Sequence, residues 1–375
     1  MTSPKFKICH IIAGAPTGGA ETFCLDAVKA LHDRGVEQIM ISRPHNEYVK
    51  ATAQRGIQHY PASFNRFTKW LQQAKIARII NEHNPDIVHC WMNRASSFTP
   101  KAIKQPVLGW FGGYYNLKNF QRCDFYMGVT RDIVRHIGEA SGHPENAYLG
   151  HTFGTLAEDP PVSRADFGLP EGKPLALLLS RMHWKKGVDL MLEAAQRLPD
   201  MVFLLAGDGP DLEKYKVMAR SLGVEDRVRF PGWRTDRASL LSIADICVLP
   251  SRYEPFGTVI AEAWFAGVPL VATKADGARQ YVTHEKDGLL LDIDDLDGLV
   301  QCLDRAANNQ TLRKALVSNG QKTYGELFSK QVVIDNLIAS YSDIITRYEN
   351  RQTSPPCFPA SPQTGEISQA LPPLK

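Results

Sequence analysis

Two glutamates eight positions apart lie in the stretch SRYEPFGTVIAEAWFAGVPLVAT, residues 251–273. Glu254 precedes a Pro-Phe-Gly corner, and Glu262 lies within an otherwise apolar run, where an ionised carboxylate is costly to bury without a partner. Carboxylates only accept hydrogen bonds, so a fixed pair of them suits the several hydroxyl donors of a sugar. This pair therefore indicates a sugar-binding site.

The corner between the glutamates predicts a helix start. Gly257 and Thr258 would open the helix, Gly267 would follow its end, and Pro269 would separate it from a strand. The free N–H groups and the positive dipole end of a helix start favour a phosphate. Phosphate beside sugar hydroxyls suggests a nucleotide sugar. The alternative is that Glu262 caps the helix or lies at the edge of the core, while Glu254 is a solvated loop residue. The pair by itself leaves both interpretations open.

Two basic residues lie in LALLLSRMHWKKGVDLMLEAAQRL, residues 175–198. Arg181 follows a predicted buried strand, and Lys186 comes just before a helix that opens at Gly187. Ligands of open α/β sheets bind at the carboxyl ends of the strands. An arginine fork with a lysine suits a diphosphate that gains charge as it leaves, a task usually given to a divalent metal. The alternative is a solvated basic loop.

A glycine pair near the N-terminus also follows a strand and opens a helix. In AGAPTGGAETF, Gly18 and Gly19 allow close approach of the backbone to a ligand, and the helix starting near Ala20 offers N–H groups to an anion. The stretch is neither G-x-G-x-x-G nor a Walker sequence, which argues against a nicotinamide cofactor or a P-loop. Taken alone, the glycines also fit a simple turn.

Length and composition predict two domains of a soluble protein. The chain has 375 residues, of which 43% are hydrophobic and 22% charged. No apolar run approaches the roughly 20 residues of a membrane span, and the N-terminus lacks a secretory pattern. Seven cysteines and eleven histidines show no metal-ligand spacing. We therefore expect a cytoplasmic protein without a metal or other cofactor.

Basic residues are concentrated in the first half. Residues 1–155 hold 18 Lys and Arg against 11 Asp and Glu, while the remainder holds 25 against 29. The basic half could face anionic lipid, a phosphorylated glycolipid or water. The segment FNRFTKWLQQAKIARII, residues 64–80, has the aromatic and basic residues of an interfacial helix, although an ordinary domain helix has the same pattern. No other basic run carries aromatics, so no nucleic-acid partner is expected.

Apolar runs alternate with helical patterns in both halves, which predicts two doubly wound α/β units. The expected strands are FKICHIIA, QIMIS, DIVHCW, PVLGW, FYMGVT, AYLGH, LALLLS, MVFLLAG, VRFPGW, ICVLPS, PLVAT and GLLL. Helices are expected at 20–33, 68–83, 131–140 and 330–348. The expected organisation is an N-terminal domain 1–155, a linker 156–173, a C-terminal domain 174–330, a helix 331–350 packing back toward the N-terminal domain, and a disordered tail 351–375.

Together these motifs resemble glycosyltransferase family 4, whose members are retaining enzymes of the GT-B fold, with two Rossmann-like domains facing across a cleft. The stretches that carry the resemblance are GGAE, SRMHWKKG, LLAGDGP, VRFPGW and EPFGTVIAEAWFAGVPLVAT. The resemblance covers essentially residues 6–348, and these stretches occur within it in the family's order and spacing. The resemblance implies a C-terminal domain that binds the nucleotide-sugar donor and an N-terminal domain that binds the acceptor.

The resemblance also implies roles for the residues that hold the donor phosphates. Arg181 and Lys186 would bind the diphosphate, with help from the backbone N–H groups of Phe256, Gly257 and Thr258.

Other positions would bind the remaining parts of the donor. Glu254 would face hydroxyls of the donor sugar and belong to the catalytic set, and Glu262 would bind the ribose hydroxyls. Gly232 and Trp233 would meet the base.

The N-terminal domain departs from the family pattern. Many members have a histidine after the strand that corresponds to PVLGW, whereas this chain has Phe111, so a catalytic histidine is in doubt. Gly18 and Gly19 would approach the donor phosphates from this side. The candidates for the acceptor site are His89, Gly112, Gly113 and Tyr114, although a packed core position is the favoured alternative for this histidine.

The implied reaction is transfer of a sugar to a glycan or glycolipid, in the cytoplasm or at the inner face of the plasma membrane. GWFGGYYNLKNF is similar to segments of enzymes that assemble lipopolysaccharide core or capsule. Two alternatives stay open, because a fold does not fix a function. One is a sugar-nucleotide epimerase of the same architecture, and the other is a catalytically silent protein that binds nucleotide sugars.

Overall fold

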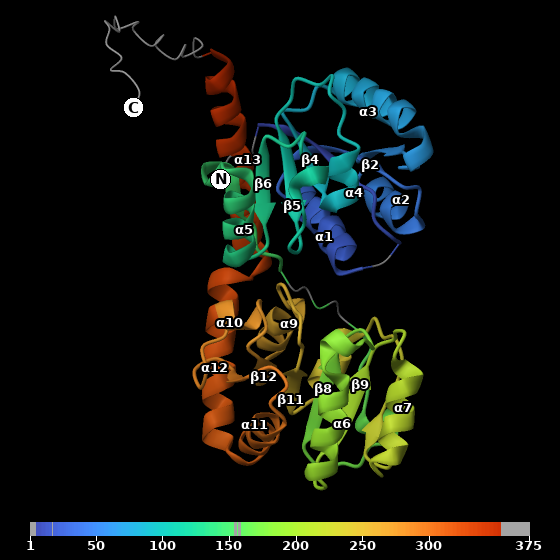
Figure 1. The fold of residues 1–375 in the computed structure, drawn as a ribbon, viewed down its shortest axis with the longest axis vertical. Helices are drawn as coiled ribbons and strands as arrows, with labels where there is room; N and C mark the ends of the chain where they lie inside the picture. Colours follow the sequence, from blue (N-terminus) through green and yellow to red (C-terminus); the bar gives the residue numbers. More distant parts are fainter. Residues whose placement is uncertain (1–4, 17, 154–155, 157–158, 354–375) are drawn as a thin grey trace, which may run out of the picture.

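A computed structural model describes residues 5–16, 18–153, 156 and 159–353. These residues form two parallel sheets with helices packed around them (Figure 1). The doubly wound architecture predicted for both halves is thus confirmed.

The first sheet has seven strands in the order β3-β2-β1-β4-β5-β6-β7. Its strands are β1 (Lys7–Ile12), β2 (Glu37–Ser42), β3 (Gln58–Pro61), β4 (Ile87–Trp91), β5 (Val107–Phe111), β6 (Phe125–Gly128) and β7 (Ala147–Leu149). Its helices are α1 (Gly19–Asp33), α2 (Asn46–Ala53), α3 (Lys69–His83), α4 (Met92–Ser97) and α5 (Arg131–Ser141). The strand order reverses between β1 and β4, which is where ligands bind in folds of this type.

The second sheet has six strands in the order β10-β9-β8-β11-β12-β13. Its strands are β8 (Leu175–Leu179), β9 (Val202–Ala206), β10 (Val228–Arg229), β11 (Ile246–Leu249), β12 (Leu270–Thr273) and β13 (Leu289–Leu291). Its helices are α6 (Val188–Arg197), α7 (Leu212–Ser221), α8 (Arg237–Ser242), α9 (Thr258–Ala266), α10 (Ala278–Tyr281), α11 (Leu296–Asn308) and α12 (Gln310–Leu327). The reversal here falls between β8 and β11, the strands before the SRMHWKKG loop and the Pro-Phe-Gly corner.

Each of the expected strands lies in one of these two sheets, and the expected helices correspond to α1, α3, α5 and the last helix. The strand β3 and the helices α2, α4, α7, α8, α10, α11 and α12 were not predicted. β3 is a four-residue edge strand of sequence QHYP, in which no residue is fully buried, so it lacks an apolar run. α4 has six residues, and a helix of that length shows hardly more than one turn of periodicity.

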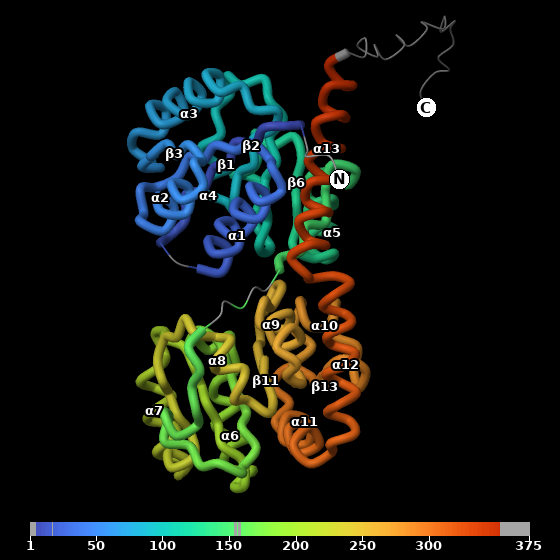
Figure 2. The backbone as a smooth tube through the Cα atoms, turned by 180° about the vertical axis from the view of Figure 1, so that it is seen from behind, coloured from blue at the N-terminus to red at the C-terminus, as the bar shows by residue number. Residues whose placement is uncertain are grey.

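The last helix, α13 (Lys330–Thr353), follows the second domain and runs back along the first (Figures 1 and 2). Its contacts with the first domain include a 2.6 Å ion pair of Arg34 with Asp335 and a 2.8 Å hydrogen bond from Arg347 to the Glu145 carbonyl. The tail expected from residue 351 is wrong for residues 351–353, which continue the helix because no proline occurs before Pro355. The rest of that prediction lies outside the described residues.

The domains also touch through a polar contact between α5 and α10. The backbone N–H of Asp132 donates to Gln280 at 3.0 Å, and the Asp132 carboxylate accepts from Arg279 at 2.7 Å. In the segment expected to be a linker, Arg164 lies in a short 3-10 turn and pairs with Asp245 of the second domain at 2.7 Å. Part of that segment is therefore fixed to the second domain.

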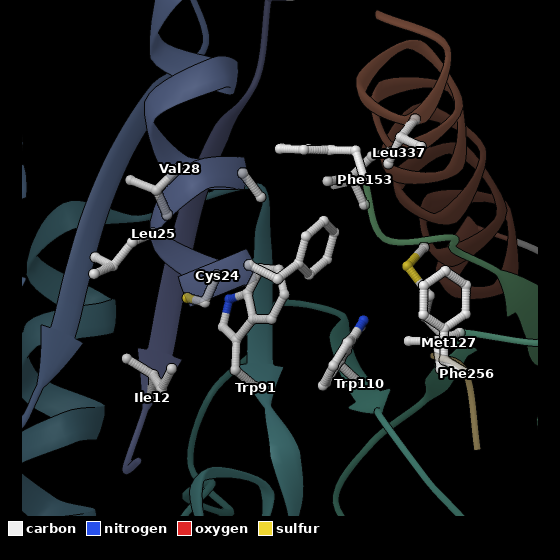
Figure 3. Packing of buried hydrophobic residues seen from close by; sticks show 14 of the residues in the cluster. Ile12, Cys24, Leu25, Val28, Trp91, Trp110, Met127, Phe153, Phe256 and Leu337 are labelled. Carbon is white, nitrogen blue, oxygen red and sulfur yellow. The ribbon is translucent and has the colours of Figure 1, made fainter. Parts of the chain in front are cut away.

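One hydrophobic cluster runs through the first sheet, α13 and the adjoining side of the second domain. Figure 3 shows part of it, with Trp91 and Trp110 of the first sheet, Leu337 of α13 and Phe256 of the second domain. The other side of the second sheet has a cluster of its own. This continuous cluster holds the two domains together along one side. A pocket lies between the ends of their strands.

Candidate donor pocket between the two domains

A pocket of about 540 Å³ lies between the two domains. Its wall on the first domain comes from α1 and Phe153, and its wall on the second comes from the loops after β8, β9, β10 and β11 with the first turn of α9. The predicted site residues that line it are Gly18, Gly19, Arg181, Lys186, Trp233, Glu254, Thr258 and Glu262. Segments far apart in the sequence thus meet at the carboxyl ends of the strands.

Lys186 and Glu254 form an ion pair in this pocket. The Lys186 Nζ lies 2.6 Å from Glu254 Oε2, and 23% and 15% of the two side chains are exposed. The loop after β8 must pack tightly on the end of β11 to make this contact. Gly187 allows it, since its φ is 65° and a Cβ there would lie 2.0 Å from the Pro250 carbonyl oxygen. The sequence predicted both charged residues but not their pairing.

Arg181 lies at the carboxyl end of β8 with its side chain exposed to the pocket. Within the described part of the chain, no hydrogen-bond or ion-pair partner contacts its guanidinium group. This guanidinium adds a positive charge without an ion-pair partner, within the described residues, to the pocket that Lys186 also lines. An anion such as a diphosphate would be attracted to it.

The Pro-Phe-Gly corner opens α9, as predicted. Gly257 takes a left-handed conformation with φ 83° at the helix start, and Thr258 follows it into the pocket. The Phe256 side chain turns the other way, into the core, where it packs on Tyr281 and Phe328. Phe256 therefore anchors the corner, and only its backbone could meet a ligand.

Glu262 is the deepest charged residue of the pocket, with 1% of its surface exposed. The Arg237 guanidinium, from the start of α8, donates a hydrogen bond to its Oε1. Burial raises the pKa of the Glu262 carboxyl, and the charge of Arg237 opposes that rise. The prediction that a carboxylate in this apolar run needs a partner is therefore correct, and the partner comes from another helix.

The loop after β10 brings Trp233 to the mouth of the pocket. The indole is 64% exposed although it belongs to the pocket wall. Gly232 does not line the pocket itself, but it turns the loop with φ 76° and accepts a 2.8 Å hydrogen bond from the Gly207 N–H. An exposed aromatic face beside a charged pocket can stack on a planar base.

The glycine pair opens α1 on the opposite wall. A Cβ at Gly18 would lie 2.3 Å from Glu21 Oε2, the end of a flexible side chain that can move aside, so the surrounding space does not require a glycine at that position. Gly19 has open space around its Cα, so only a ligand would require a glycine at that position. Thr22, Phe23 and Asp26 follow on the same face of α1 and line the pocket, at the i+3 and i+4 spacing that could have predicted them.

Among the acceptor candidates, His89 was wrongly placed. It is fully buried within β4, where its Nδ1 lies 2.7 Å from the Tyr341 hydroxyl of α13, and it does not line the pocket. All five residues of β4 are buried because the strand lies inside a parallel sheet, so a histidine in it faces the core. Burial also lowers its pKa well below 6.5.

The glycine-tyrosine stretch after β5 lies against the second domain. A Cβ on Gly113 would be 4.0 Å from the Tyr253 hydroxyl, next to Glu254 in the chain. Gly112 fits against the Trp110 ring, and Tyr114 is partly buried beside His136. These three acceptor candidates are therefore near the pocket without lining it.

The described residues contain no group of three metal-ligating side chains close enough to hold a metal ion. Within the same residues, no helix has the length and apolar character that crossing a membrane requires.

Comparison with known proteins identifies the family. The family model described as "Glycosyltransferase Family 4" matches residues 17–144, and the one described as "Glycosyl transferases group 1" matches residues 160–323. The chain is 32% identical over 344 residues to the lipopolysaccharide core biosynthesis glycosyltransferase LpsD of Rhizobium meliloti, covering 91% of this chain and 98% of LpsD. The chain belongs to glycosyltransferase family 4.

Solved structures show the same fold for this family 4 chain. A glycosyltransferase from Rickettsia africae superimposes with a TM-score of 0.81 at 22% identity, over 91% of this chain and 99% of that one. HepE of Anabaena, solved in complex with UDP-glucose, gives a TM-score of 0.78 at 21% identity, over 90% and 99% of the two chains. The GT-B fold inferred from the sequence is therefore confirmed, and the protein is a glycosyltransferase.

Proposed function

We propose that this glycosyltransferase moves a sugar from a nucleoside-diphosphate donor to a hydroxyl group of an envelope glycan or glycolipid. The observation that carries the proposal is the charge arrangement of the pocket, with Arg181 and Lys186 beside Glu254 and with Glu262 deeper in the wall. Two cations fit a diphosphate, and the carboxylates fit the hydroxyls on either side of it. The UDP-glucose complex of HepE supports a nucleotide-sugar donor, and the name of LpsD supports an acceptor in the lipopolysaccharide core.

In the proposed reaction the bond between the anomeric carbon and the diphosphate oxygen breaks, and the acceptor oxygen bonds to the same face of that carbon. The acceptor hydroxyl proton passes to the departing phosphate oxygen, so no protein base is required. Arg181 and Lys186 stabilise the charge that grows on the diphosphate, as a divalent metal does elsewhere. Glu254 orients the donor sugar. Retention and independence of a metal are parts of the proposal.

The test is turnover of a panel of UDP-, GDP- and ADP-sugars by the purified protein, with envelope glycan extracts as acceptors and mass spectrometry as the readout. Nucleotide release from one donor, together with a heavier glycan, would support the proposal and name the donor. Conversion of the donor into an isomeric nucleotide sugar would favour the epimerase instead. Binding without turnover of any donor would favour the silent binding protein.

The proposal places the enzyme at the inner face of the plasma membrane, through a surface that we call the α3 patch: Arg66, Phe67, Lys69, Trp70 and Leu71. Phe67, Trp70 and Leu71 are 95%, 70% and 47% exposed. Arg66 and Lys69 are also exposed, and no acidic residue occurs between positions 61 and 81. Aromatic side chains interleaved with uncompensated positive charge fit an anionic lipid surface.

Co-sedimentation with vesicles tests this location. Phe67→Ser with Trp70→Ser should abolish binding to vesicles of phosphatidylcholine and phosphatidylglycerol, while vesicles of phosphatidylcholine alone should bind neither form. The control pair, Val217→Ser with Phe265→Ser, removes two exposed apolar residues of the second domain, 52% and 48% exposed, and should bind as the parent does. Equal binding by both pairs would contradict a role for the α3 patch.

A further inference from the structure

Arg237 stands in the donor pocket but belongs to none of the motifs that predicted the site. It opens α8, whereas its partner Glu262 lies on α9. About 36% of the Arg237 side chain is exposed, against 2% for that of Glu262. The pair therefore links a buried carboxylate to a cation that reaches the pocket.

The two oxygens of the Glu262 carboxylate have different surroundings. Oε1 accepts a hydrogen bond from Arg237, but Oε2 is buried and has no hydrogen-bond partner within the described residues. A buried charged acceptor without a donor is costly, and such an atom in a pocket wall marks a place where a ligand donor is needed. A hydroxyl group is a donor of suitable size.

We infer that Arg237 is a positioning residue for the donor: it fixes Oε1 of Glu262 and thereby holds Oε2 ready to accept a hydrogen bond from a ribose hydroxyl. The inference rests on the proposed function, because the nucleotide must enter this pocket. It goes beyond that function by assigning a task to a residue outside the E-x7-E pattern. Arg237 acts through Glu262 and need not touch the ligand.

The surroundings of Glu262 make its charge depend on Arg237. Helices α8 and α12 and strands β11 and β12 pack against α9. From β11 the Cys247 thiol is near the carboxylate, whereas Arg313 of α12 pairs with Asp245. Asp26 of α1 and the Lys186–Glu254 pair line the same pocket. Removing Arg237 would therefore raise the pKa of the Glu262 carboxyl further, because burial would act unopposed.

The experiment measures nucleotide affinity by calorimetry in the full-length protein between pH 5 and pH 8. The probes are UDP, GDP and ADP, and for the tightest of them the analogue that lacks both ribose hydroxyls. Arg237→Ala should weaken the affinity for the ribonucleotide by roughly 10- to 100-fold, which is the range of a hydrogen bond to a charged group. It should leave the affinity for the dideoxy analogue unchanged. As the pH falls, the variant should lose affinity at a higher pH than the parent protein. Arg237→Lys keeps the charge, so it should restore most of the ribonucleotide affinity and most of the parent protein's pH dependence.

A cycle with Glu262→Gln separates positioning from other roles. In that background Arg237→Ala should have no further effect on affinity, because there is no carboxylate left to orient. Equal weakening of the ribonucleotide and its dideoxy analogue, or a full effect of Arg237→Ala in the Glu262→Gln background, would overturn the inference. So would a variant with unchanged affinity and pH profile. If the parent protein binds no nucleotide or nucleotide sugar, both the proposed function and this inference are wrong.

Discussion

The Lys186 ammonium group and the Glu254 carboxylate lie 2.6 Å apart in the pocket between the two domains. The two residues are 68 positions apart in the sequence and follow different strands, β8 and β11. Since these strands are neighbours in the sheet, their carboxyl ends bring the two loops together. The pair gives the pocket a cation for a phosphate and an anion for a hydroxyl at one point.

Loss of either partner of this pair should reduce catalysis. We expect Lys186→Met to lower kcat/KM for the donor by roughly 100- to 1000-fold, as removal of one charge-stabilising donor does. The double exchange Lys186→Glu with Glu254→Lys keeps an ion pair, so it should restore much of the melting temperature lost in the single variants. It should not restore turnover, because the cation then lies at the wrong position. Recovery of turnover in the doubly exchanged variant would contradict the assignment of the cation to position 186 and of the carboxylate to position 254.

Arg181 should act on the donor without contributing to the fold. Its guanidinium has no partner within the described residues, and changes at such exposed sites have small effects on stability. The melting temperature of Arg181→Ala should therefore lie within about 1 °C of that of the parent protein. The same variant should lower turnover by at least roughly 100-fold. Arg220→Ala, an exposed arginine of α7 outside the pocket, is the control and should keep full activity. An active Arg181→Ala variant would remove this residue from the site.

Trp233 should contribute to donor affinity rather than to turnover. Because its exposed ring lies at the pocket mouth, Trp233→Ala should raise the donor KM by roughly tenfold, as loss of one stacking contact does, with kcat nearly unchanged. Trp233→Phe should recover part of the loss. Phe265→Ala, an exposed aromatic residue outside the pocket, should change neither constant. A fall in kcat alone would argue against base stacking.

Gly187 should be required for stability, because its backbone passes close to Pro250. Ala at this position would have a left-handed φ and a Cβ 2.0 Å from a carbonyl oxygen, so Gly187→Ala should destabilise the protein by more than about 3 kcal/mol. Gly223 has nearly the same φ, 66°, with nothing within 4 Å of a Cβ. Gly223→Ala should therefore cost only about 1 kcal/mol. Urea unfolding of the two variants measures the difference, and equal losses would contradict the close approach.

Two buried histidines of the first domain, His10 and His89, and the partly buried His151 should make stability depend on pH. Burial lowers the pKa of His10 and His151 from 6.5 to about 4 and that of His89 well below 6.5. Between pH 6.5 and pH 4 the unfolded chain binds these protons and the folded chain does not. The free energy of unfolding should therefore fall as the pH decreases through this window, by up to about 1.4 kcal/mol per pH unit for each histidine. The slope should be smaller in His151→Phe, and an unchanged slope would show that this histidine does not contribute.

The sequence determined most of the strands and four charged residues of the proposed donor site. Apolar runs of four to eight residues between glycine and proline signals marked the long strands, because a strand inside a parallel sheet is buried on both faces. Arg181, Lys186 and Glu254 were found because each lies in a loop after such a strand. Glu262 was found because a carboxylate interrupts the apolar run of α9. Their chemistry depends on side-chain type and on the strand end nearby, and both are local properties of the chain.

Tertiary structure alone decided which charged groups pair and which histidine is buried. Arg237 and Glu262 are 25 positions apart on separate helices, so no local pattern links them. His89 follows a strand pattern that fits a cleft residue as well as a core residue, and the structure places it inside, within the fully buried β4 and against Tyr341 of α13. Contacts between elements depend on how the sheets and helices are stacked, and that stacking is set by the whole core rather than by any one segment.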